Sequence, residues 1–413
     1  MKSSMFAFAT DLSGEGLDAV LENVQHRAGV EEITLAAAYH AGRDVFPHNP
    51  SGRVRYLEAG AAFFRPNAAL YDGLLLKPRT SSLVDGDSEK LLRGDPLGEL
   101  CEAAGRRGMK TNAWLVFLHN DRLGFEHPEC ATQNAFGDRY LTDLCPANPE
   151  VRAYCRTLAT DVARYGVSNI FAESLHYHGL GHGYHHERYF EDLGAVGTFL
   201  LGLCFCEHCL EAASRDGVDG ETARRSVREE LLLRFEREVD DEPDELTRER
   251  LEPFGGEELL GYLDSRTSTV TSLAGEVSAA AGEHAVLIFL DISGAEKGFA
   301  TGKPEGGAAP GIGWRMGIDV TALAGACDAV EALGYAADPT RVGSDLAAYR
   351  TLIGDPSKLG LLLRPMPPDN RSAENLADKL SLARDLSLAR ADFYHYGFCR
   401  LNALDRVRRA LSK

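Results

Sequence analysis

The sequence predicts a single (β/α)8 barrel spanning residues 1–413, with a long helical insertion after the fourth strand. Eight short apolar or β-branched runs alternate with longer charged stretches of helical character, which is the pattern of repeated βα units on a parallel sheet. A chain of 413 residues is also long enough for such a barrel with insertions. Eight repeats fit a closed barrel better than an open doubly wound sheet.

The predicted strands are residues 6–10, 32–39, 110–118, 168–173, 285–291, 328–334, 359–364 and 391–396. Helices are predicted at about residues 16–26, 97–105 and 149–165, and a closing helix is predicted at 401–411. The chain makes a long excursion between the second and third strands, where we expect a hairpin within residues 55–64.

Two stretches depart from the regular alternation. Residues 177–283 are expected to form a metal-binding loop followed by the helical insertion, because acidic and basic residues interleave there as on a solvated face. A partner-binding arm is the other interpretation of this segment. Residues 293–317 are rich in glycine and follow the fifth strand, at the end of the barrel where the active sites of barrel enzymes lie. We expect a mobile lid or a plain long loop there.

The charge balance excludes several partners. The chain has 44 Lys and Arg against 62 Asp and Glu, a formal net charge of −18, and no long basic run. Nucleic acids and anionic membranes need a concentrated positive face, so neither is an expected partner. The expected substrate is a neutral or cationic small molecule. Assembly into a homo-oligomer is a further possibility.

The apolar runs are short. None approaches the roughly 18 residues that a membrane helix needs, and the N-terminal apolar run is broken at Asp11, so we interpret it as a strand and not as a signal sequence. We therefore expect a cytoplasmic location.

Cysteine spacing predicts a metal site. Cys204, Cys206 and Cys209 stand within six residues of one another among nine cysteines, and thiolates at such spacings can converge on one tetrahedral zinc ion. The preferred fourth ligand is Cys145, with Cys130 or His208 as alternatives. A closed site of four thiolates has no position for water and would be structural. The other interpretation is four small buried side chains, and no organic cofactor is expected.

The residues around this cluster resemble a known family. Glu173 ends the fourth strand, a Cys-Pro stretch begins at Cys145 before it, and Cys-x-Cys-x-x-Cys follows it. This arrangement, over residues 143–209, resembles the zinc-bearing β-galactosidases of glycoside hydrolase family 42 and related clan A barrels. The resemblance implies that Glu173 is the general acid/base and that four cysteines bind structural zinc.

The same family pattern is broken in two places. Its acid/base follows an asparagine, whereas Ala172 precedes Glu173 here. Its nucleophile is a glutamate at the end of the seventh strand, whereas this strand ends in Leu363-Arg364. The second carboxyl group must therefore come from another strand.

Two carboxyl groups usually cleave a glycosidic bond, one as acid and one as nucleophile or base. Glu173 is the predicted acid because the apolar residues before it would raise its pKa, although a structural pair with Arg43 or Arg364 is the alternative. Asp291, at the end of the fifth strand, or Glu331, in the sixth, is the predicted partner.

Each predicted partner also has a structural interpretation. Asp291 could cap the following loop, and Glu331 could belong to an interior salt bridge. Asp11, after the first strand, is a weaker candidate and is interpreted as a helix cap.

Residues suited to sugars recur at the predicted strand ends. Aromatic faces stack on sugar rings, and imidazole, guanidinium and amide groups meet hydroxyls. The predicted substrate-binding residues are Tyr39, His40, Arg43, Trp114, His119, His176, Arg364, Tyr394 and His395.

A histidine-rich loop supports a rival hypothesis. Residues 176–187 carry five histidines and end in Glu187, so they could hold a catalytic zinc or iron in a metal-dependent hydrolase or lyase. A non-catalytic carbohydrate-binding barrel is a third hypothesis. The favoured prediction is a glycoside hydrolase that cleaves a neutral glycoside or oligosaccharide.

Overall fold

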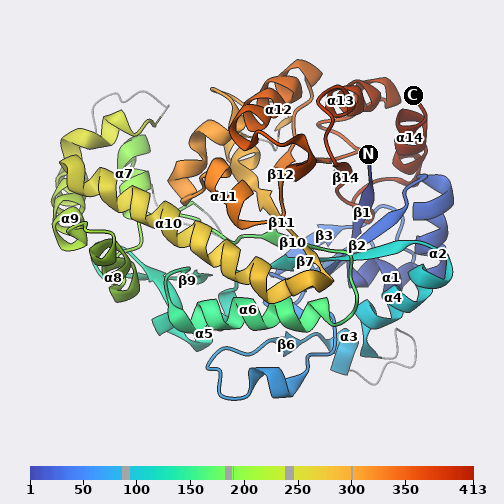
Figure 1. Cartoon of the computed structure of the whole chain (residues 1–413), viewed down its shortest axis with the longest axis horizontal. Coiled ribbons are helices and arrows are strands. Elements are labelled where there is room, and N and C mark those ends of the chain that lie inside the picture. The colour runs from blue at the N-terminus through green and yellow to red at the C-terminus, as the bar shows by residue number, and fades with distance from the viewer. Residues whose placement is uncertain (86–93, 182–187, 189, 238–245, 299–300) are drawn as a thin grey trace.

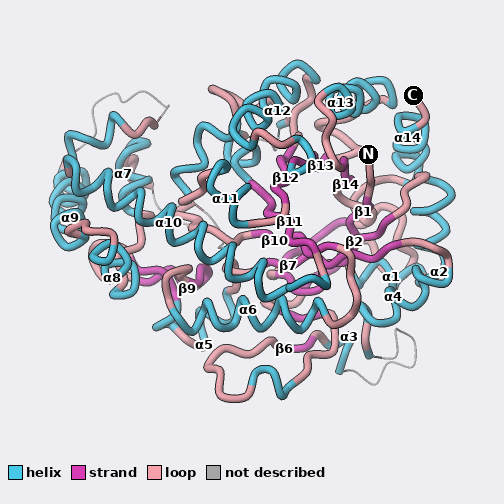
Figure 2. Tube along the Cα trace, in the orientation of Figure 1, coloured by secondary structure: helices cyan, strands magenta, loops and turns pink. Residues whose placement is uncertain are grey.

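The computed structural model describes residues 1–85, 94–181, 188, 190–237, 246–298 and 301–413. Eight parallel strands close into the predicted barrel. They are β1 (Ser4–Ala7), β2 (Glu32–Tyr39), β7 (Lys110–Val116), β10 (Asn169–Glu173), β11 (Val286–Asp291), β12 (Ala329–Leu333), β13 (Leu359–Leu363) and β14 (Arg390–Phe393). Each pairs with the next, and β1 pairs with both β2 and β14. The strands lie at the centre of the molecule with helices around them (Figures 1 and 2).

The first strand is shorter than predicted. It ends at Ala7, and helix α1 (Ala9–Glu15) begins where residues 8–10 were expected to continue the strand. The carboxylate of Asp11 accepts a hydrogen bond of 2.8 Å from the backbone N–H of Phe8, which starts the helix early. Gly16, with φ of +94°, separates α1 from α2 (Leu17–Glu22), which continues into η1 (Asn23–Arg27).

The excursion after β2 pairs differently from the expected hairpin. β3 (Gly42–Val45) pairs antiparallel with β4 (Val54–Leu57), so residues 55–57 belong to an earlier hairpin. The chain then turns at Gly60, whose φ is +54°, and β5 (Ala61–Ala62) joins the edge of β2. The remaining elements of the excursion are η2 (Ala68–Tyr71), β6 (Arg79–Thr80), α3 (Ser82–Asp85) and α4 (Pro96–Arg106).

Helices cover the outside of the barrel. Between β7 and β10 lie α5 (Asp121–Glu126), η4 (Pro128–Cys130), the hairpin of β8 (Ala131–Gln133) and β9 (Arg139–Leu144), and α6 (Pro149–Ala163). After β11 come η7 (Ile292–Lys297), η9 (Ala309–Met316) and α11 (Val320–Ala326). The last helices are α12 (Pro339–Ile353), α13 (Ala373–Asp385) and α14 (Leu401–Leu411), with the short turn η10 (Pro356–Lys358) before β13.

The segment between β10 and β11 divides into two parts. α7 (Gly194–Leu201), α8 (Glu207–Arg215) and α9 (Gly220–Glu236) form one end of the molecule, on the left of Figure 1. After η5 (Glu249–Phe254), the long helix α10 (Gly256–Ala281) runs from that end back to the barrel and packs against α6 and α11; η6 (Gly282–His284) connects it to β11. Although it was predicted as part of the insertion, α10 thus takes the place of the barrel helix between β10 and β11.

Polar side chains fill the lower layer of the barrel interior. Arg390, at the start of β14, forms ion pairs of 3.0 Å with Glu32 and 2.5 Å with Asp392. Its guanidinium also lies 4.8 Å from the centre of the Phe171 ring. Phe171 and Phe6 make an edge-to-face pair in the same interior.

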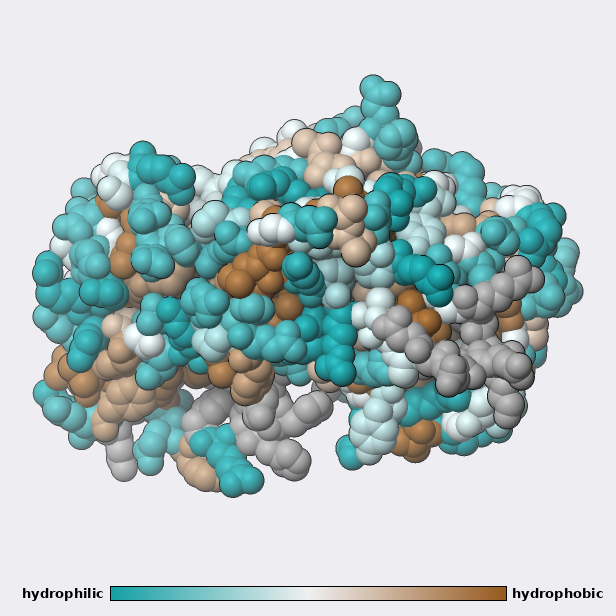
Figure 3. Space-filling view, turned by 90° about the horizontal axis from the view of Figure 1, so that it is seen from below, coloured by the Kyte–Doolittle hydropathy of each residue, from teal (hydrophilic) through white to brown (hydrophobic). Residues whose placement is uncertain are grey.

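The surface is mixed in character. Figure 3 shows apolar patches among polar side chains, one of them towards the end of the molecule that carries α7–α9. Leu232, Leu233 and Phe235 of α9 are exposed apolar residues. Within the described residues, no helix combines the length and apolar character that crossing a bilayer requires.

Candidate active site

A cavity of about 220 Å³ opens at the carboxyl end of the barrel strands, the position where barrel enzymes keep their active sites. Its described lining comprises Phe6, Tyr39, Trp114, Glu173, Ser174, Leu290, Ile292, Ala295, Glu296, Leu333, Tyr335, Leu362, Arg364 and Tyr394. Five of these were predicted from the sequence as site residues: Tyr39, Trp114, Glu173, Arg364 and Tyr394.

Glu173 lies at the centre of the arrangement. It is the last residue of β10, and strand alternation turns it inward together with Phe171. Trp114 of β7 donates a hydrogen bond of 2.6 Å from Nε1 to Oε2 of Glu173. Burial raises the pKa of Glu173 to about 7, and the tryptophan bond offsets part of that rise. Glu173 therefore holds its proton up to neutral pH and can donate it.

The residue after Glu173 has an unusual backbone. Ser174 has φ of +55°, in the left-handed region that side chains other than glycine rarely adopt. Its carbonyl accepts a hydrogen bond of 3.0 Å from the N–H of Leu118. Such conformations persist where the surrounding structure holds them and are common at functional sites.

Aromatic side chains form the walls of the cavity. The ring of Trp114 lies 4.5 Å from that of Tyr39 and 5.7 Å from that of Tyr394, both edge to face. Burial raises the pKa of Tyr39, Tyr335 and Tyr394 above the ordinary value, so these hydroxyls stay protonated. The walls therefore offer apolar ring faces and neutral hydrogen-bonding groups.

Arg364 contacts the cavity but is held by another acid. Its Nε and Nη2 donate to Asp369 at 2.5 and 2.7 Å, and its guanidinium stacks 4.5 Å from the ring centre of Tyr335. Arg43, the other predicted cation, is an exposed residue of β3 and does not contribute to the described lining. The basic groups considered as structural partners of Glu173 are thus engaged or directed elsewhere.

Asp291 lies outside the cavity. Leu290 faces inward, so strand alternation turns Asp291 outward, towards the helices. Its carboxylate is fully buried and accepts hydrogen bonds from the N–H and Oγ of Ser293, at 2.9 and 2.6 Å, and from the hydroxyl of Tyr349, at 2.7 Å. The structure gives Asp291 the role of a cap for the turn after β11.

Glu331 lies below the cavity. It points into the barrel from the middle of β12, and its carboxylate is 3.9 Å from Nε of Arg390 in the polar layer. Burial and the neighbouring Asp392 raise the pKa of Glu331 well above its usual range. Glu331 therefore belongs to the interior charge network around Arg390. The described lining of the cavity does not include it.

The predicted histidines form a row beside the cavity. His40 stacks on His119 with ring centres 4.6 Å apart, His119 lies 5.7 Å from His178, and His178 lies 4.8 Å from His176. Nδ1 of His178 is 3.1 Å from a carboxylate oxygen of Asp143. None of these side chains belongs to the described lining of the 220 Å³ cavity. Residues 182–187, which carry the other histidines of the predicted metal loop, lie outside the described residues.

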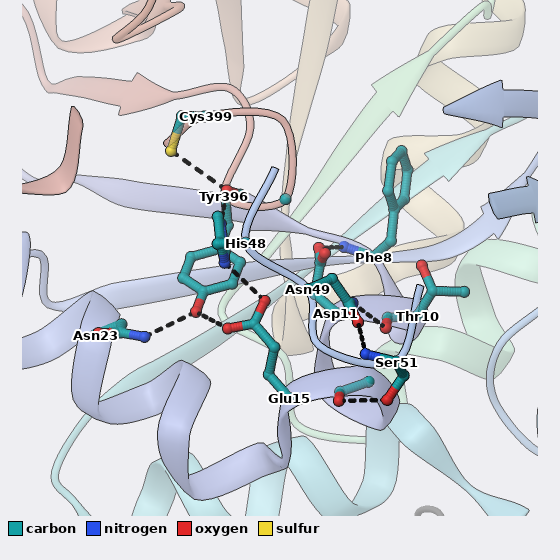
Figure 4. Close-up of polar contacts among 12 residues, drawn as sticks. Phe8, Thr10, Asp11, Glu15, Asn23, His48, Asn49, Ser51, Tyr396 and Cys399 are labelled. Carbon is teal, nitrogen blue, oxygen red and sulfur yellow. Dashed lines mark hydrogen bonds and ion pairs between the residues drawn. The ribbon is translucent and has the colours of Figure 1, made fainter. Parts of the chain in front are cut away.

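His395 and Asp11 are buried near the barrel mouth without lining the cavity. The His395 ring lies 4.1 Å from Phe8, and burial lowers the pKa of His395 well below its usual value, so it is neutral. Asp11 is the predicted helix cap, and burial raises its pKa to about 7. Figure 4 shows Asp11 beside an ion pair of 2.9 Å between His48 and Glu15. This network fastens the start of α1 and the β3–β4 hairpin to the barrel.

The sequence interpretation missed three polar residues of the cavity, which are Ser174, Tyr335 and Glu296. Tyr335 lies two residues after the end of β12, and Glu296 belongs to η7 in the glycine-rich segment after β11. That segment was predicted as a mobile lid or a plain long loop, and its position after a barrel strand was the available signal for Glu296. Burial raises the pKa of Glu296, and the guanidinium of Arg315 opposes the rise.

A second cavity, of about 460 Å³, lies between the barrel mouth and the insertion. Glu296 lines both cavities. The segment after β10 contributes His178 and Leu180 to the lining of the second cavity, and α7 contributes Thr198 and Phe199. Two arginines also line it, Arg266 on α10 and Arg315 on η9. The two cavities therefore adjoin at Glu296.

Four buried cysteines form a group that can hold a metal ion. The ligand atoms of Cys145, Cys204, Cys206 and Cys209 all lie within 4.8 Å of one another. The Sγ atom of Cys145 is 3.4 Å from that of Cys209, 3.5 Å from that of Cys206 and 3.9 Å from that of Cys204. Four sulfurs placed ~2.3 Å from one tetrahedral ion would be about 3.8 Å apart, so the observed spacing fits such an ion.

The surroundings of the cysteine group are also suitable for thiolates. The backbone N–H of Gln133, in β8, donates to Sγ of Cys204 at 3.3 Å, and the hydroxyl of Tyr177 lies 3.3 Å from Sγ of Cys209. Cys130, the alternative ligand, is buried elsewhere and is not in the group, and neither is His208.

Comparisons with known proteins give no match by sequence and a clear match by structure. No protein-family model matches the chain, and no curated protein matches it. A β-galactosidase from the psychrophilic Marinomonas ef1 has a TM-score of 0.56 at 12% identity, covering 100% of this chain and 59% of that one. The catalytic domain of a β-amylase from Paenibacillus polymyxa has a TM-score of 0.53 at 10% identity, covering 98% and 94%. An α-L-fucosidase from Paenibacillus thiaminolyticus has a TM-score of 0.53 at 12% identity, covering 100% and 49%.

These likenesses concern the fold. The chain spans about half to three fifths of the length of the β-galactosidase and the fucosidase, and nearly all of the β-amylase catalytic domain. At such low identity they show a shared barrel, and several glycoside hydrolases are built on it. The predicted (β/α)8 barrel is thereby confirmed.

Proposed function

We propose that the chain is a glycoside hydrolase in which Glu173 protonates the leaving oxygen of the substrate. The observation that carries this proposal is the environment of Glu173. Its carboxyl ends a barrel strand, faces a cavity, has a pKa raised to about 7 and contacts no described cation. A general acid needs a pKa near the working pH, and a carboxyl in an apolar pocket acquires one.

The cavity supports a sugar as the substrate. Pyranose rings have apolar faces that stack on aromatic rings and hydroxyls that need hydrogen-bonding partners. Trp114, Tyr39 and Tyr394 supply the aromatic rings. The tyrosine hydroxyls and Arg364 supply the hydrogen-bonding partners. The volume of about 220 Å³ is below the usual range for drug-sized ligands, so one sugar ring enters the barrel mouth at a time.

The reaction that this geometry serves is a single proton donation at bond cleavage. As the bond between the anomeric carbon and the leaving oxygen breaks, that oxygen takes the proton of Glu173 and leaves as an alcohol, and the oxygen of a water molecule, which gives up one proton, bonds to the anomeric carbon. The hydrogen bond from Trp114 then stabilises the resulting carboxylate. Enzymes named for acting on sugars, such as the β-galactosidase and β-amylase compared above, use the same fold.

A panel of chromogenic aryl glycosides tests the proposal. The wild-type chain should hydrolyse at least one of them, and Glu173→Gln should lose about a hundred-fold or more in kcat/KM, the range ascribed to general acids. Glu102→Gln is the matched control, because Glu102 is an exposed glutamate of α4. Sugar binding without turnover by the wild type would indicate a carbohydrate-binding barrel and would refute the enzymatic proposal.

We further propose that the four-cysteine group holds zinc. All four ligands are sulfur and all are buried, which suits a closed, structural zinc site. Such an ion would join the β8–β9 region, through Cys145, to the loop before α8 and to the first turn of that helix. Metal analysis of protein prepared without chelators should find one zinc per chain; another metal, or none, would contradict this assignment.

A reducing compartment is part of the same proposal. All nine cysteines are free thiols in the structure, and cysteines in reducing compartments stay in that form or bind metal. We therefore propose a cytoplasmic location, which fractionation of the source cells would test directly.

A further inference from the structure

We propose that Glu296 is the second carboxylate of the active site and activates the water that attacks the sugar. This inference rests on the proposed glycoside hydrolase function. Within the described lining of the 220 Å³ cavity, Glu173 and Glu296 are the acidic side chains. The two carboxylates predicted from the sequence, Asp291 and Glu331, are committed to the contacts described above.

Glu296 has the availability that a base requires. Its side chain lines both cavities and is reached by solvent there, although the protein around it raises its pKa; no hydrogen bond or ion pair to it is found within the described part of the chain. By contrast, the carboxylate of Asp291 takes three hydrogen bonds and is fully buried. A carboxylate without fixed partners can accept a proton from water without first breaking another contact.

The turn that carries Glu296 is held in place from both sides. Asp291 caps the start of η7 through the N–H of Ser293. Gly294 packs so closely on β12 that a Cβ there would lie 2.7 Å from the carbonyl oxygen of Leu333, which only glycine permits. The cap and the close approach together direct the end of η7 over the barrel mouth. Asp291 is thus a positioning residue for Glu296.

The position of Glu296 favours attack by water over attack by the carboxylate itself. Glu296 lies on the turn beyond β11, whereas Glu173 lies on the strand end, and Glu296 also faces the larger second cavity. Water can reach it from there. In the reaction, Glu296 takes one proton from water, the water oxygen bonds to the anomeric carbon, the glycosidic bond breaks and Glu173 gives its proton to the leaving oxygen. The product then has inverted configuration at the anomeric carbon.

The joined cavities also indicate how the substrate lies. The small cavity takes the sugar ring that is attacked, and the adjoining cavity of about 460 Å³ takes the rest of the substrate. The substrate class is therefore a glycoside with at least a second ring or a bulky aglycone, cleaved at the junction beside Glu296.

Kinetics of Glu296→Gln and Glu296→Ala test the inference on the aryl glycoside that the wild type hydrolyses. We expect kcat to fall at least about a hundred-fold with KM changed less than about three-fold. Azide should restore turnover to Glu296→Ala by yielding a glycosyl azide of inverted configuration. Glu305→Gln, at an exposed position of the same segment, is the control and should match the wild type.

The outcomes separate this inference from the proposed function. If the wild type turns over and Glu173→Gln is inactive, but Glu296→Gln keeps full activity or the product has retained configuration, the role of Glu296 is refuted and the function stands. If the wild type hydrolyses no glycoside, both fail. Equal melting temperatures of the variants and the wild type exclude misfolding as the cause of any loss.

Discussion

The indole N–H of Trp114 and the carboxylate of Glu173 form a hydrogen bond of 2.6 Å across neighbouring strands of the barrel. Burial raises the pKa of Glu173, and this bond lowers it. The pKa of about 7 is the balance of burial and this hydrogen bond. A substitution can therefore change one of the two effects and leave the other in place.

Trp114→Phe should move the alkaline limb of the activity profile. Without the indole N–H, the carboxylate loses the bond that favours its ionised form, so the pKa of Glu173 rises. The acid then stays protonated to higher pH, and the fall of kcat/KM at high pH should shift upward by about one unit, since a hydrogen bond to a charged group contributes about 1.5 kcal/mol or more.

The chain has a second tryptophan that serves as the control for this variant. Trp314 lies on η9 and packs against Phe199, away from Glu173, so Trp314→Phe should leave the limb unchanged. If the alkaline fall of kcat/KM in Trp114→Phe occurs at the same pH as in the wild type, or at a lower pH, a group other than Glu173 controls that fall.

Glu173→Gln should stabilise the fold while removing activity. The folded chain raises the pKa of Glu173 above its ordinary value near 4.5 to about 7, so the stability linked to protonation is present at low pH and is lost as the pH rises through 7. Glutamine cannot ionise, and its oxygen can still accept the bond from Trp114.

The melting temperatures of wild type and Glu173→Gln should therefore agree near pH 4 and diverge in favour of the variant by pH 8. Differential scanning calorimetry measures this. A variant less stable than the wild type at pH 8 would indicate that Glu173 is a structural, paired carboxylate.

Cys145→Ser and Cys130→Ser should behave differently although both thiols are buried. Cys145 is in the four-cysteine group and Cys130 is not. We expect Cys145→Ser to lose its metal and to unfold at lower denaturant concentration, because structural zinc contributes directly to folding free energy. Cys130→Ser should keep one metal per chain. Equal metal content in both variants would contradict the zinc assignment.

Arg390→Met and Glu331→Gln should differ sharply in stability. Arg390 neutralises Glu32 and Asp392 in the barrel interior, and removing a buried partner costs about 3–5 kcal/mol. Burial already favours the protonated form of Glu331, so glutamine should change the free energy of unfolding by less than about 1 kcal/mol. Urea denaturation compares the two; similar losses would mean that Glu331 is an essential ionic partner.

Much of the fold could be predicted from the sequence because the barrel strands are short apolar runs. The eighth strand, for example, is Arg390–Phe393, which overlaps the predicted 391–396 at residues 391–393. β1 was predicted too long because its apolar run continues into α1, and apolar composition alone does not distinguish a strand from a buried helix. The hydrogen bond from the backbone N–H of Phe8 to the carboxylate of Asp11 decides the boundary.

The site was predicted in part because strand ends identify a face but not an orientation. Glu173 and Leu290 both face inward, whereas Asp291, one residue beyond Leu290, faces the helices. A shift of one residue exchanges the two faces of a strand, and the sequence alone does not give the register. Glu296 lies on a turn, so strand periodicity carries no information about it.

The dependence of activity on the leaving group tests the role of Glu173 most directly. A dinitrophenyl glycoside leaves readily without a proton, whereas an alkyl or sugar leaving group needs one. Glu173→Ala should therefore retain most of its kcat/KM on the dinitrophenyl substrate and lose about a hundred-fold or more on the alkyl substrate. An equal loss on both substrates would contradict proton donation by Glu173.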